Sequence, residues 1–304
     1  MGQDDYIIRR AAFDWLESQK MLYDDVIPRD ILAKGFEWEG QRVPLLGPQG
    51  IFKPRILDIP LSITTIPSGP YDDGYSDNGM LLYRYRGVDP QHRDNVGLRK
   101  AMHDRIPLVY FYRLDKGKYL VVWPVFIVED QPQSLTFKVQ VDDAQAVDNL
   151  VLAHENENNL QDEGGEARRA YITAAVQQRV HQRSFRVRVL KAYQQQCAMC
   201  RLRHEELLDA AHIIPDADPD GEPVVSNGLA LCKIHHAAFD RKFLGIRPDY
   251  VIEVREDIMQ ESDGPMLQHG LKGMHNTSLW VPMKQTQQPN ANLLARRYEE
   301  FKVA

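Results

Sequence analysis

Apolar residues recur at helical spacing at the start of the chain. The positions that carry this period are Ile8, Ala12, Trp15 and Leu16. They predict a helix within residues 4–35, and the segment after Pro28 predicts a second, shorter helix. From Phe36 onward the composition changes to short aromatic and β-branched runs separated by glycine and proline. This change indicates that a β-rich domain follows the helices.

The β-rich segment continues to about residue 142. Its clearest strands are expected at 107–114, 117–130 and 134–141, and a helix is expected at 95–104. Many short strands with closely spaced turn signals favour a compact, barrel-like sheet with a few helices. We therefore expect an α+β chain whose first domain covers residues 1–142.

The charge pattern changes sign after this domain. The chain has 304 residues and a net charge of −6, which argues weakly against a nucleic-acid partner. Residues 142–166 contain eight acidic residues and no lysine or arginine, so we expect an acidic linker at 143–167. Residues 167–204 contain no acidic residue. This basic segment begins a second domain, expected at 168–304. It concentrates positive charge in one part of a chain whose net charge is negative.

The basic segment has helical apolar spacing with cations around it. The cations are Arg179, Arg183, Arg186, Arg188 and Lys191. A charge run is usually a solvated face, but here we favour contacts with a DNA backbone.

Several classes of protein are disfavoured. No run of eighteen apolar residues exists, and the N-terminus has charged residues where a signal peptide would need an apolar block. We therefore expect no membrane insertion or export. All three cysteines lie within residues 197–232, in a pattern typical of metal binding, which fits a reducing cytoplasm.

The cysteines and one histidine form two pairs. Cys197 and Cys200 are separated by two residues, and Cys232 and His235 repeat that gap. Tetrahedral zinc takes four such ligands, so we predict a structural zinc site. The alternative is two unrelated buried thiols beside a surface histidine.

A purely structural zinc site does not need the other polar residues of this stretch. His212 ends an apolar, strand-like run, Asn227 precedes a second short strand, and His236 and Asp240 lie four residues apart on an expected helix. These residues resemble the HNH (ββα-metal) nucleases. The resemblance implies that His212 is the general base, that Asn227 orients it, and that His236 and Asp240 hold a catalytic Mg²⁺ or Mn²⁺.

One position departs from a common form of that motif. Many HNH enzymes have a metal ligand directly before the base, where this chain has Ala211. Asp209 lies two residues earlier on the same side of the expected strand, so it is a candidate for the missing ligand. The alternative is a solvated charge or a cap at the end of the strand.

Residues 71–87 resemble the signature of SRA domains, barrel-like modules of the PUA-like superfamily that flip a modified cytosine out of DNA. The matching residues are Tyr71, Asp72, Asp73, the turn at 77–79, and Tyr83. The resemblance implies a base-binding pocket formed by Tyr71, Asp73 and Tyr83, although the second tyrosine could instead be Tyr85. Aromatic faces stack on a flipped base, and a carboxylate can accept from its amino group.

Residues 168–300 resemble a bacterial group of HNH restriction endonucleases, on the segments RVHQRSFR, AYQQQCAMC and DAAHIIP. The two resemblances together imply a modification-dependent endonuclease that acts on double-stranded DNA carrying 5-methylcytosine or 5-hydroxymethylcytosine. Methylated adenine and phosphorothioate DNA are the alternatives to these two bases. One active site cuts one strand, so double-strand cleavage requires a dimer or two binding events, and a homodimer is expected. The alternatives are an HNH endonuclease that reads unmodified sequence and a zinc-containing reader of modified DNA without catalysis.

Overall fold

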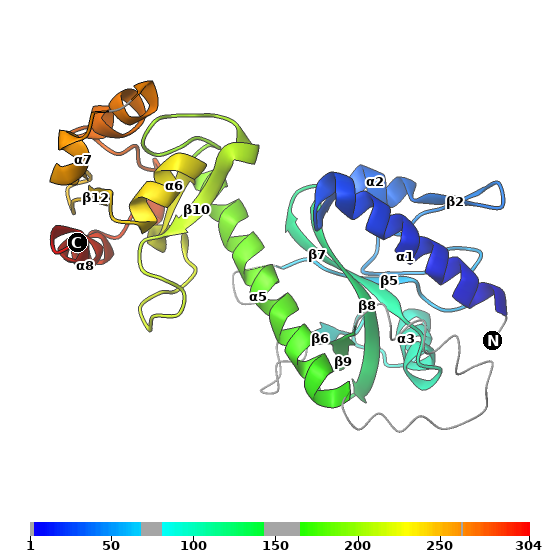
Figure 1. Cartoon of the computed structure of the whole chain (residues 1–304). Coiled ribbons are helices and arrows are strands. Elements are labelled where there is room, and N and C mark those ends of the chain that lie inside the picture. Colours follow the sequence, from blue (N-terminus) through cyan, green and yellow to red (C-terminus); the bar gives the residue numbers. More distant parts are fainter. Residues whose placement is uncertain (1–2, 68–80, 143–164, 263) are drawn as a thin grey trace. The chain divides into compact units, whose positions relative to one another are not determined.

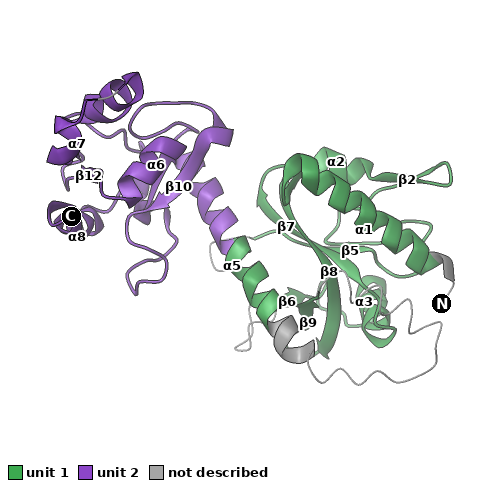
Figure 2. Ribbon diagram, viewed as in Figure 1, with its two compact units in different colours: residues 1–180 green, residues 181–304 purple. Residues whose placement is uncertain are grey.

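The computed structural model describes residues 3–67, 81–142, 165–262 and 264–304. The chain forms two compact units, Met1–Val180 and His181–Ala304 (Figures 1 and 2). The boundary between them falls inside helix α5 (Gly165–Ala192), whereas the sequence suggested a boundary in the acidic segment 143–167, most of which lies outside the described residues.

Helix α5 contributes to two different cores. Val180 is buried in a core of the first unit, and Ile172 and Val176 pack against it. The Thr173 hydroxyl, in the same half of the helix, accepts a 3.1 Å hydrogen bond from the backbone N–H of Val141. Five residues after Val180, Phe185 belongs to the core of the second unit. The first turns of α5 therefore belong with the sheet, which is why the boundary lies within the helix.

The described strands of the first unit form one large sheet with the order β4-β5-β7-β8-β9-β6, and β1 pairs with β8. The strands are β1 (Val26–Pro28), β4 (Ile51–Phe52), β5 (Ser62–Thr65), β6 (Leu81–Arg84), β7 (Leu108–Asp115), β8 (Lys118–Gln131) and β9 (Thr136–Val141). Strands β5 and β7 are parallel, and the other pairs are antiparallel. In the described part of the chain the strand path ends at β4 and β6 and does not close, and the sheet is a curled half-barrel (Figure 1). The strands and the helix expected after residue 95 are confirmed.

Both faces of this sheet are covered. In β7, Val109 and Phe111 face one core, while Leu108 and Tyr110 face the other. Because side chains alternate along a strand, a run that is apolar throughout requires partners on both faces. Helix α1 (Gln3–Tyr23) contributes to the core that Val109 and Phe111 face, together with α2 (Arg29–Lys34) and the hairpin β2 (Phe36–Trp38) and β3 (Gln41–Val43). Helix α3 (Arg93–His103) contributes to the core that Leu108 and Tyr110 face.

The second unit is built on a ββα arrangement. Strands β10 (Leu208–His212) and β11 (Gly228–Cys232) pair antiparallel, and α6 (Lys233–Asp240) follows directly. The remaining elements are the single turns η1 (Glu205–Leu207), η2 (Val225–Asn227), η4 (Lys272–Met274) and η5 (Gln285–Gln287), the hairpin β12 (Leu244–Ile246) and β13 (Ile252–Val254), and the helices α7 (Glu256–Gln260), η3 (Met266–Leu271) and α8 (Ala291–Lys302).

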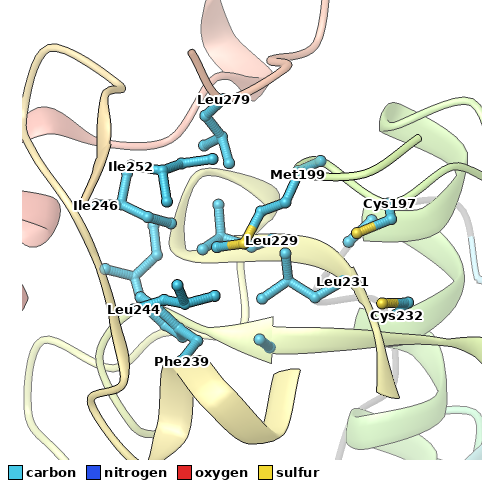
Figure 3. Close-up of a cluster of buried hydrophobic side chains, with 14 of the residues drawn as sticks. Cys197, Met199, Leu229, Leu231, Cys232, Phe239, Leu244, Ile246, Ile252 and Leu279 are labelled. Atoms are coloured by element: carbon cyan, nitrogen blue, oxygen red, sulfur yellow. The ribbon is translucent and has the colours of Figure 1, made fainter. Parts of the chain in front are cut away.

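One apolar cluster joins these elements. Leu229 and Leu231 of β11 contact residues of α6, β12 and β13, with Cys197 and Cys232 at one end of the cluster (Figure 3). Helix α8 packs on β12, where a Cβ added at Gly245 would lie 2.4 Å from the Phe301 ring. The C-terminal segment therefore completes the core of the second unit. Within the described parts of the chain, no helix combines the length and the apolar character that crossing a membrane requires.

Candidate metal centres and catalytic site

Three thiols and one imidazole converge in the second unit. The ligand atoms of Cys197, Cys200, Cys232 and His235 all lie within 4.8 Å of one another. Cys200 Sγ is 3.9 Å from Cys232 Sγ, and His235 Nδ1 is 3.2 Å from Cys232 Sγ. A tetrahedral zinc ion with Zn–S bonds of about 2.3 Å would hold two sulfurs about 3.8 Å apart. The observed spacing fits such an ion.

The orientation of His235 supports the same conclusion. Its Nε2–H donates a 2.7 Å hydrogen bond to the carbonyl oxygen of Gly270, which leaves Nδ1 free to bind a metal. Hydrogen bonds from Cys200 and Cys232 lower the pKa of the Cys197 thiol. The same hydrogen bond between Cys197 and Cys200 raises the pKa of the Cys200 thiol, so the two sulfurs share a proton that binding of a zinc ion would displace. The predicted zinc ligands therefore form a site that can hold a tetrahedral metal ion.

His212 is the last residue of β10, paired with Gly228 of β11. Its ring stacks on Phe185 of α5, with 4.0 Å between ring centroids and 11° between planes. The Nε2 atom is buried and has no hydrogen-bond partner among the described residues, so Nδ1 is the nitrogen left for a substrate or water. Burial lowers the pKa of His212 from its usual value of 6.5. A lowered pKa keeps the imidazole neutral, as a general base requires.

Asn227 fixes the strand that carries this histidine. It is fully buried, and its side-chain amide donates to the carbonyl oxygens of Ile214 at 3.0 Å and Glu222 at 3.1 Å. Its Oδ1 accepts from the Ile214 N–H at 2.9 Å, and its backbone carbonyl accepts from the Ile213 N–H at 2.9 Å. The asparagine thus ties the end of β10 to the loop that follows it, consistent with the predicted orienting role.

His236 lies between two carboxylates. Its Nε2 is 3.3 Å from Asp240 Oδ2, and its Nδ1 is 3.5 Å from Asp209 Oδ2. Neighbouring ligands of an octahedral ion with bonds of about 2.1 Å are about 3 Å apart, so His236 Nε2 and Asp240 fit as adjacent ligands of a divalent ion. Asp209 faces the other ring nitrogen, which is the place of a carboxylate that orients a histidine ligand.

Asp209 also has cationic neighbours. Lys233 Nζ lies 2.6 Å from its Oδ2, and Arg186 Nε lies 3.8 Å from its Oδ1. Burial is the largest single effect and raises the pKa of Asp209, but the hydrogen bonds and charges of Lys233 and His236 together outweigh burial and lower the pKa. The carboxylate is therefore charged and already paired. Whether Asp209 also binds the ion stays a prediction.

A family described as HNH endonuclease matches residues 197–247. This segment begins at the first zinc ligand and ends after β12, and it contains all the predicted zinc ligands and all the predicted catalytic residues. The chain carries an HNH endonuclease domain. The prediction of an HNH-type endonuclease is therefore confirmed, and the match leaves the first unit unassigned.

Further comparisons concern the whole chain. No curated protein sequence matches it. A solved structure titled "Modification dependent TagI restriction endonuclease" is similar, with a TM-score of 0.32, 18% identity, and coverage of 80% of this chain and 81% of that one. A second, titled "Structure of the Type IV phosphorothioation-dependent restriction endonuclease ScoMcrA", has a TM-score of 0.23 and 18% identity, and covers 84% of this chain and 56% of that one.

The predicted DNA-contacting cations have partners within the chain. Arg186 Nη2 donates 2.9 Å hydrogen bonds to the carbonyl oxygens of Glu205 and Leu208, at the entry to β10 of the HNH domain. Arg188 Nη2 donates to the Pro223 carbonyl oxygen at 2.8 Å. These two arginines hold α5 against the strand and the loop of the HNH domain. The sequence analysis missed this role, because nothing in a basic run shows which backbone carbonyls will face it.

The other three cations have mixed surroundings. Arg179 Nε lies 3.8 Å from Asp25 Oδ2 within the first unit. Arg183 is half-buried and Lys191 is exposed, and both have interactions within the chain. The predicted phosphate contacts of all five cations stay predictions.

The predicted base pocket is only partly within the described residues. Tyr71 and Asp73 lie outside them. Tyr83 is 7% exposed and belongs to a core of the first unit, and burial raises the pKa of its hydroxyl. Tyr85 is equally buried, stacks on Phe137 with ring centroids 4.6 Å apart, and hydrogen-bonds to Asp130. Both tyrosines contribute to packing, and a role of either in base binding stays a prediction.

Proposed function

We propose that the chain is a modification-dependent DNA endonuclease, in which the first unit reads a modified base and the HNH domain hydrolyses the phosphodiester backbone. The observation that carries the catalytic part is the joint placement of four residues. Asn227 ties down the strand that ends in His212, and α6 presents His236 and Asp240 with a spacing that fits a divalent ion. A scaffold without catalysis has no need of this arrangement.

His212 acts as the general base. Its Nδ1 accepts a proton from the attacking water, whose oxygen forms the new bond to phosphorus while the bond from phosphorus to the 3′ oxygen breaks. The products are 5′-phosphate and 3′-hydroxyl ends. Stacking on Phe185 fixes the plane of the imidazole, and burial of Nε2 leaves Nδ1 as the working nitrogen.

His236 and Asp240 hold Mg²⁺ or Mn²⁺. The ion supplies electrostatic stabilisation of the scissile phosphate and of the leaving oxygen. The second metal site, formed by three cysteines and His235, holds a structural zinc ion. Two of its ligands precede β10 and two lie at the junction of β11 and α6, so zinc binding ties the turn after α5 to the start of α6.

Recognition of a modified base is assigned to the first unit on the resemblance of residues 71–87 to SRA domains. A curled sheet with helices on both faces is compatible with a barrel-like reader. The favoured bases are 5-methylcytosine and 5-hydroxymethylcytosine. The titles of the two similar structures name modification dependence and phosphorothioation dependence, so a test must include a phosphorothioate substrate.

The test is cleavage of one plasmid prepared in five states: unmodified, cytosine-methylated, hydroxymethylated, adenine-methylated and phosphorothioated. Each is incubated with Mn²⁺ or Mg²⁺ and the parent protein, the His212→Ala variant, or a His103→Ala control. His103 lies in the first unit with its side chain 87% exposed. We expect cutting of a cytosine-modified form only, which is lost in His212→Ala and kept in the control.

The same gel separates the alternatives. Equal cutting of all five states would make the first unit an ordinary DNA-binding module, and no cutting under any condition would favour a reader without catalysis. Linear product in place of nicked circles, with a rate that rises as the square of protein concentration, would indicate that two copies act together as a homodimer.

A further inference from the structure

Helix α8 lies outside the segment that matches the HNH family, yet it is built into the catalytic unit. Its N-terminus is next to Asn227, because the N–H of Asn290 donates a 2.9 Å hydrogen bond to the Ser226 carbonyl oxygen. Leu294 is fully buried, and Phe301 packs on Gly245 of β12. The helix is therefore a fixed platform beside the ββα segment.

Arg296 of α8 binds the loop that follows the base strand. Its Nη1 lies 3.0 Å from Asp218 Oδ1 and 3.0 Å from Asp220 Oδ2, and its Nη2 lies 2.5 Å from Asp218 Oδ2. This loop starts at Pro215, three residues after His212, and Asn227 ties its two ends. Arg296 thus fixes the middle of a loop whose ends are already held.

Arg297, the next residue, binds the other half of the site. Its Nη2 donates a 3.4 Å hydrogen bond to the carbonyl oxygen of Phe239, and its guanidinium carbon lies 5.1 Å from the centre of the Phe239 ring. Phe239 directly precedes Asp240 at the end of α6. The Arg297 side chain is only 13% exposed, so this contact is largely shielded from water.

We propose that Arg296 and Arg297 are positioning residues of the HNH site, Arg296 for the loop behind His212 and Arg297 for the end of α6 that carries Asp240. Neighbouring residues on a helix point in different directions, so one rigid helix reaches both segments. The proposal rests on the proposed nuclease function. In this proposal α8 sets the distance between the general base His212 and the ion-binding residues His236 and Asp240.

The contacts of Arg296 are exposed, and exposed ion pairs contribute little to global stability. Their bidentate geometry nevertheless defines the position of the loop. A misplacement of about 1 Å in a catalytic site can lower the rate about 100-fold. Loss of Arg296 is therefore expected to appear in local order and in kcat and to leave the melting temperature almost unchanged.

The experiment compares Arg296→Gln and Arg297→Gln with the parent protein and with Lys302→Gln, an exposed cation on the same helix. Hydrogen exchange is measured at the amides of Asp218 and Gly221 in the loop, and at those of Lys242 and Phe243 after α6, all of which are hydrogen-bonded to backbone carbonyls. Mn²⁺ binding is titrated without DNA, and cleavage of the plasmid form that the parent cuts best gives kcat and KM.

We expect the two variants to affect different segments and different measurements. Arg296→Gln should speed exchange only in the loop and lower kcat about 10-fold or more, with Mn²⁺ affinity unchanged. Arg297→Gln should speed exchange only after α6 and weaken Mn²⁺ binding about 10-fold. Arg296→Lys should be intermediate, since lysine cannot form the bidentate contact.

The proposal is overturned if each variant loosens both segments equally, or if neither changes exchange or Mn²⁺ binding relative to Lys302→Gln. These two measurements need no cleavage. A parent protein that cuts no DNA would therefore refute the proposed function and still allow the positioning roles to be decided.

Discussion

Asn227 offers a sharp test of how the base strand is held. Replacing it with aspartate keeps the size of the side chain and the oxygen that accepts from the Ile214 N–H. It removes the amide that donates to the carbonyl oxygens of Ile214 and Glu222. A carboxylate oxygen would then face two carbonyl oxygens in a fully buried position. Alanine removes all three contacts without adding a charge.

The expected magnitude follows from these hydrogen bonds. A buried polar group left without a partner costs about 1–3 kcal/mol, so three such groups in Asn227→Ala should cost roughly 3–5 kcal/mol after relaxation. For a unit of this size each kcal/mol lowers the melting temperature by about 3–5 °C, which gives a decrease of roughly 10–20 °C. Asn227→Asp should lose at least as much at neutral pH. Its buried carboxyl has a pKa above the usual value of about 3.9, so stability should return as the pH falls through that raised pKa.

Differential scanning calorimetry of the full chain measures this loss, with the transition of the first unit as an internal reference. Asn292→Asp, at an exposed position on α8, is the matched control. The reasoning is refuted if the transition of the HNH domain in Asn227→Ala or Asn227→Asp stays within about 2 °C of the parent, a shift too small for the loss of even one buried hydrogen bond.

Four further predictions concern the same domain. Because burial lowers the pKa of His212, the neutral base should persist below pH 6.5, and the acid limb of the profile of kcat/KM against pH should lie below that value. Cys200→Ser should reduce bound zinc, measured by elemental analysis, and should unfold the HNH domain while the transition of the first unit remains. An added Cβ in Gly228→Ala would lie 2.5 Å from Val189 Cγ2 and 2.9 Å from the ring of Phe185. This variant should therefore displace both side chains of α5, including the ring that stacks on His212, and lower kcat about 10-fold or more. Arg186→Gln removes the donor to two backbone carbonyls, so it should lower the melting temperature of the HNH domain. The dependence of DNA affinity on salt concentration should change little.

Local sequence was sufficient for the metal and nuclease motifs. The spacing of Cys197, Cys200, Cys232 and His235 leaves few arrangements other than a common ion, and their ligand atoms do converge. His236 and Asp240 are one helical turn apart, so helical geometry alone predicts that their side chains meet. In both cases a short spacing in the sequence, two residues between paired zinc ligands or one helical turn, determines which side chains meet.

The sheet was harder to predict because its pairing depends on contacts between distant residues. Alternating apolar runs correctly located β7, β8 and β9. The parallel pairing of β5 with β7, and the use of β8 by three neighbours, cannot be derived from the period of any single strand. The division of α5 between two cores also escaped prediction, since a continuous helical pattern carries no mark of the point where its partners change.

For the charged residues, the sequence pattern alone does not determine function. A basic run without acids indicates phosphate binding, but a guanidinium is also a good donor to buried carbonyls, and Arg186 and Arg188 are both used in this way. Asp209 raises the same question with the opposite sign, because a carboxylate that could bind a metal ion already has Lys233 and His236 at its Oδ2. A side chain's identity limits the contacts it can make, whereas the fold selects among them. The cations that contact DNA are therefore to be sought first among those whose donors the fold leaves available.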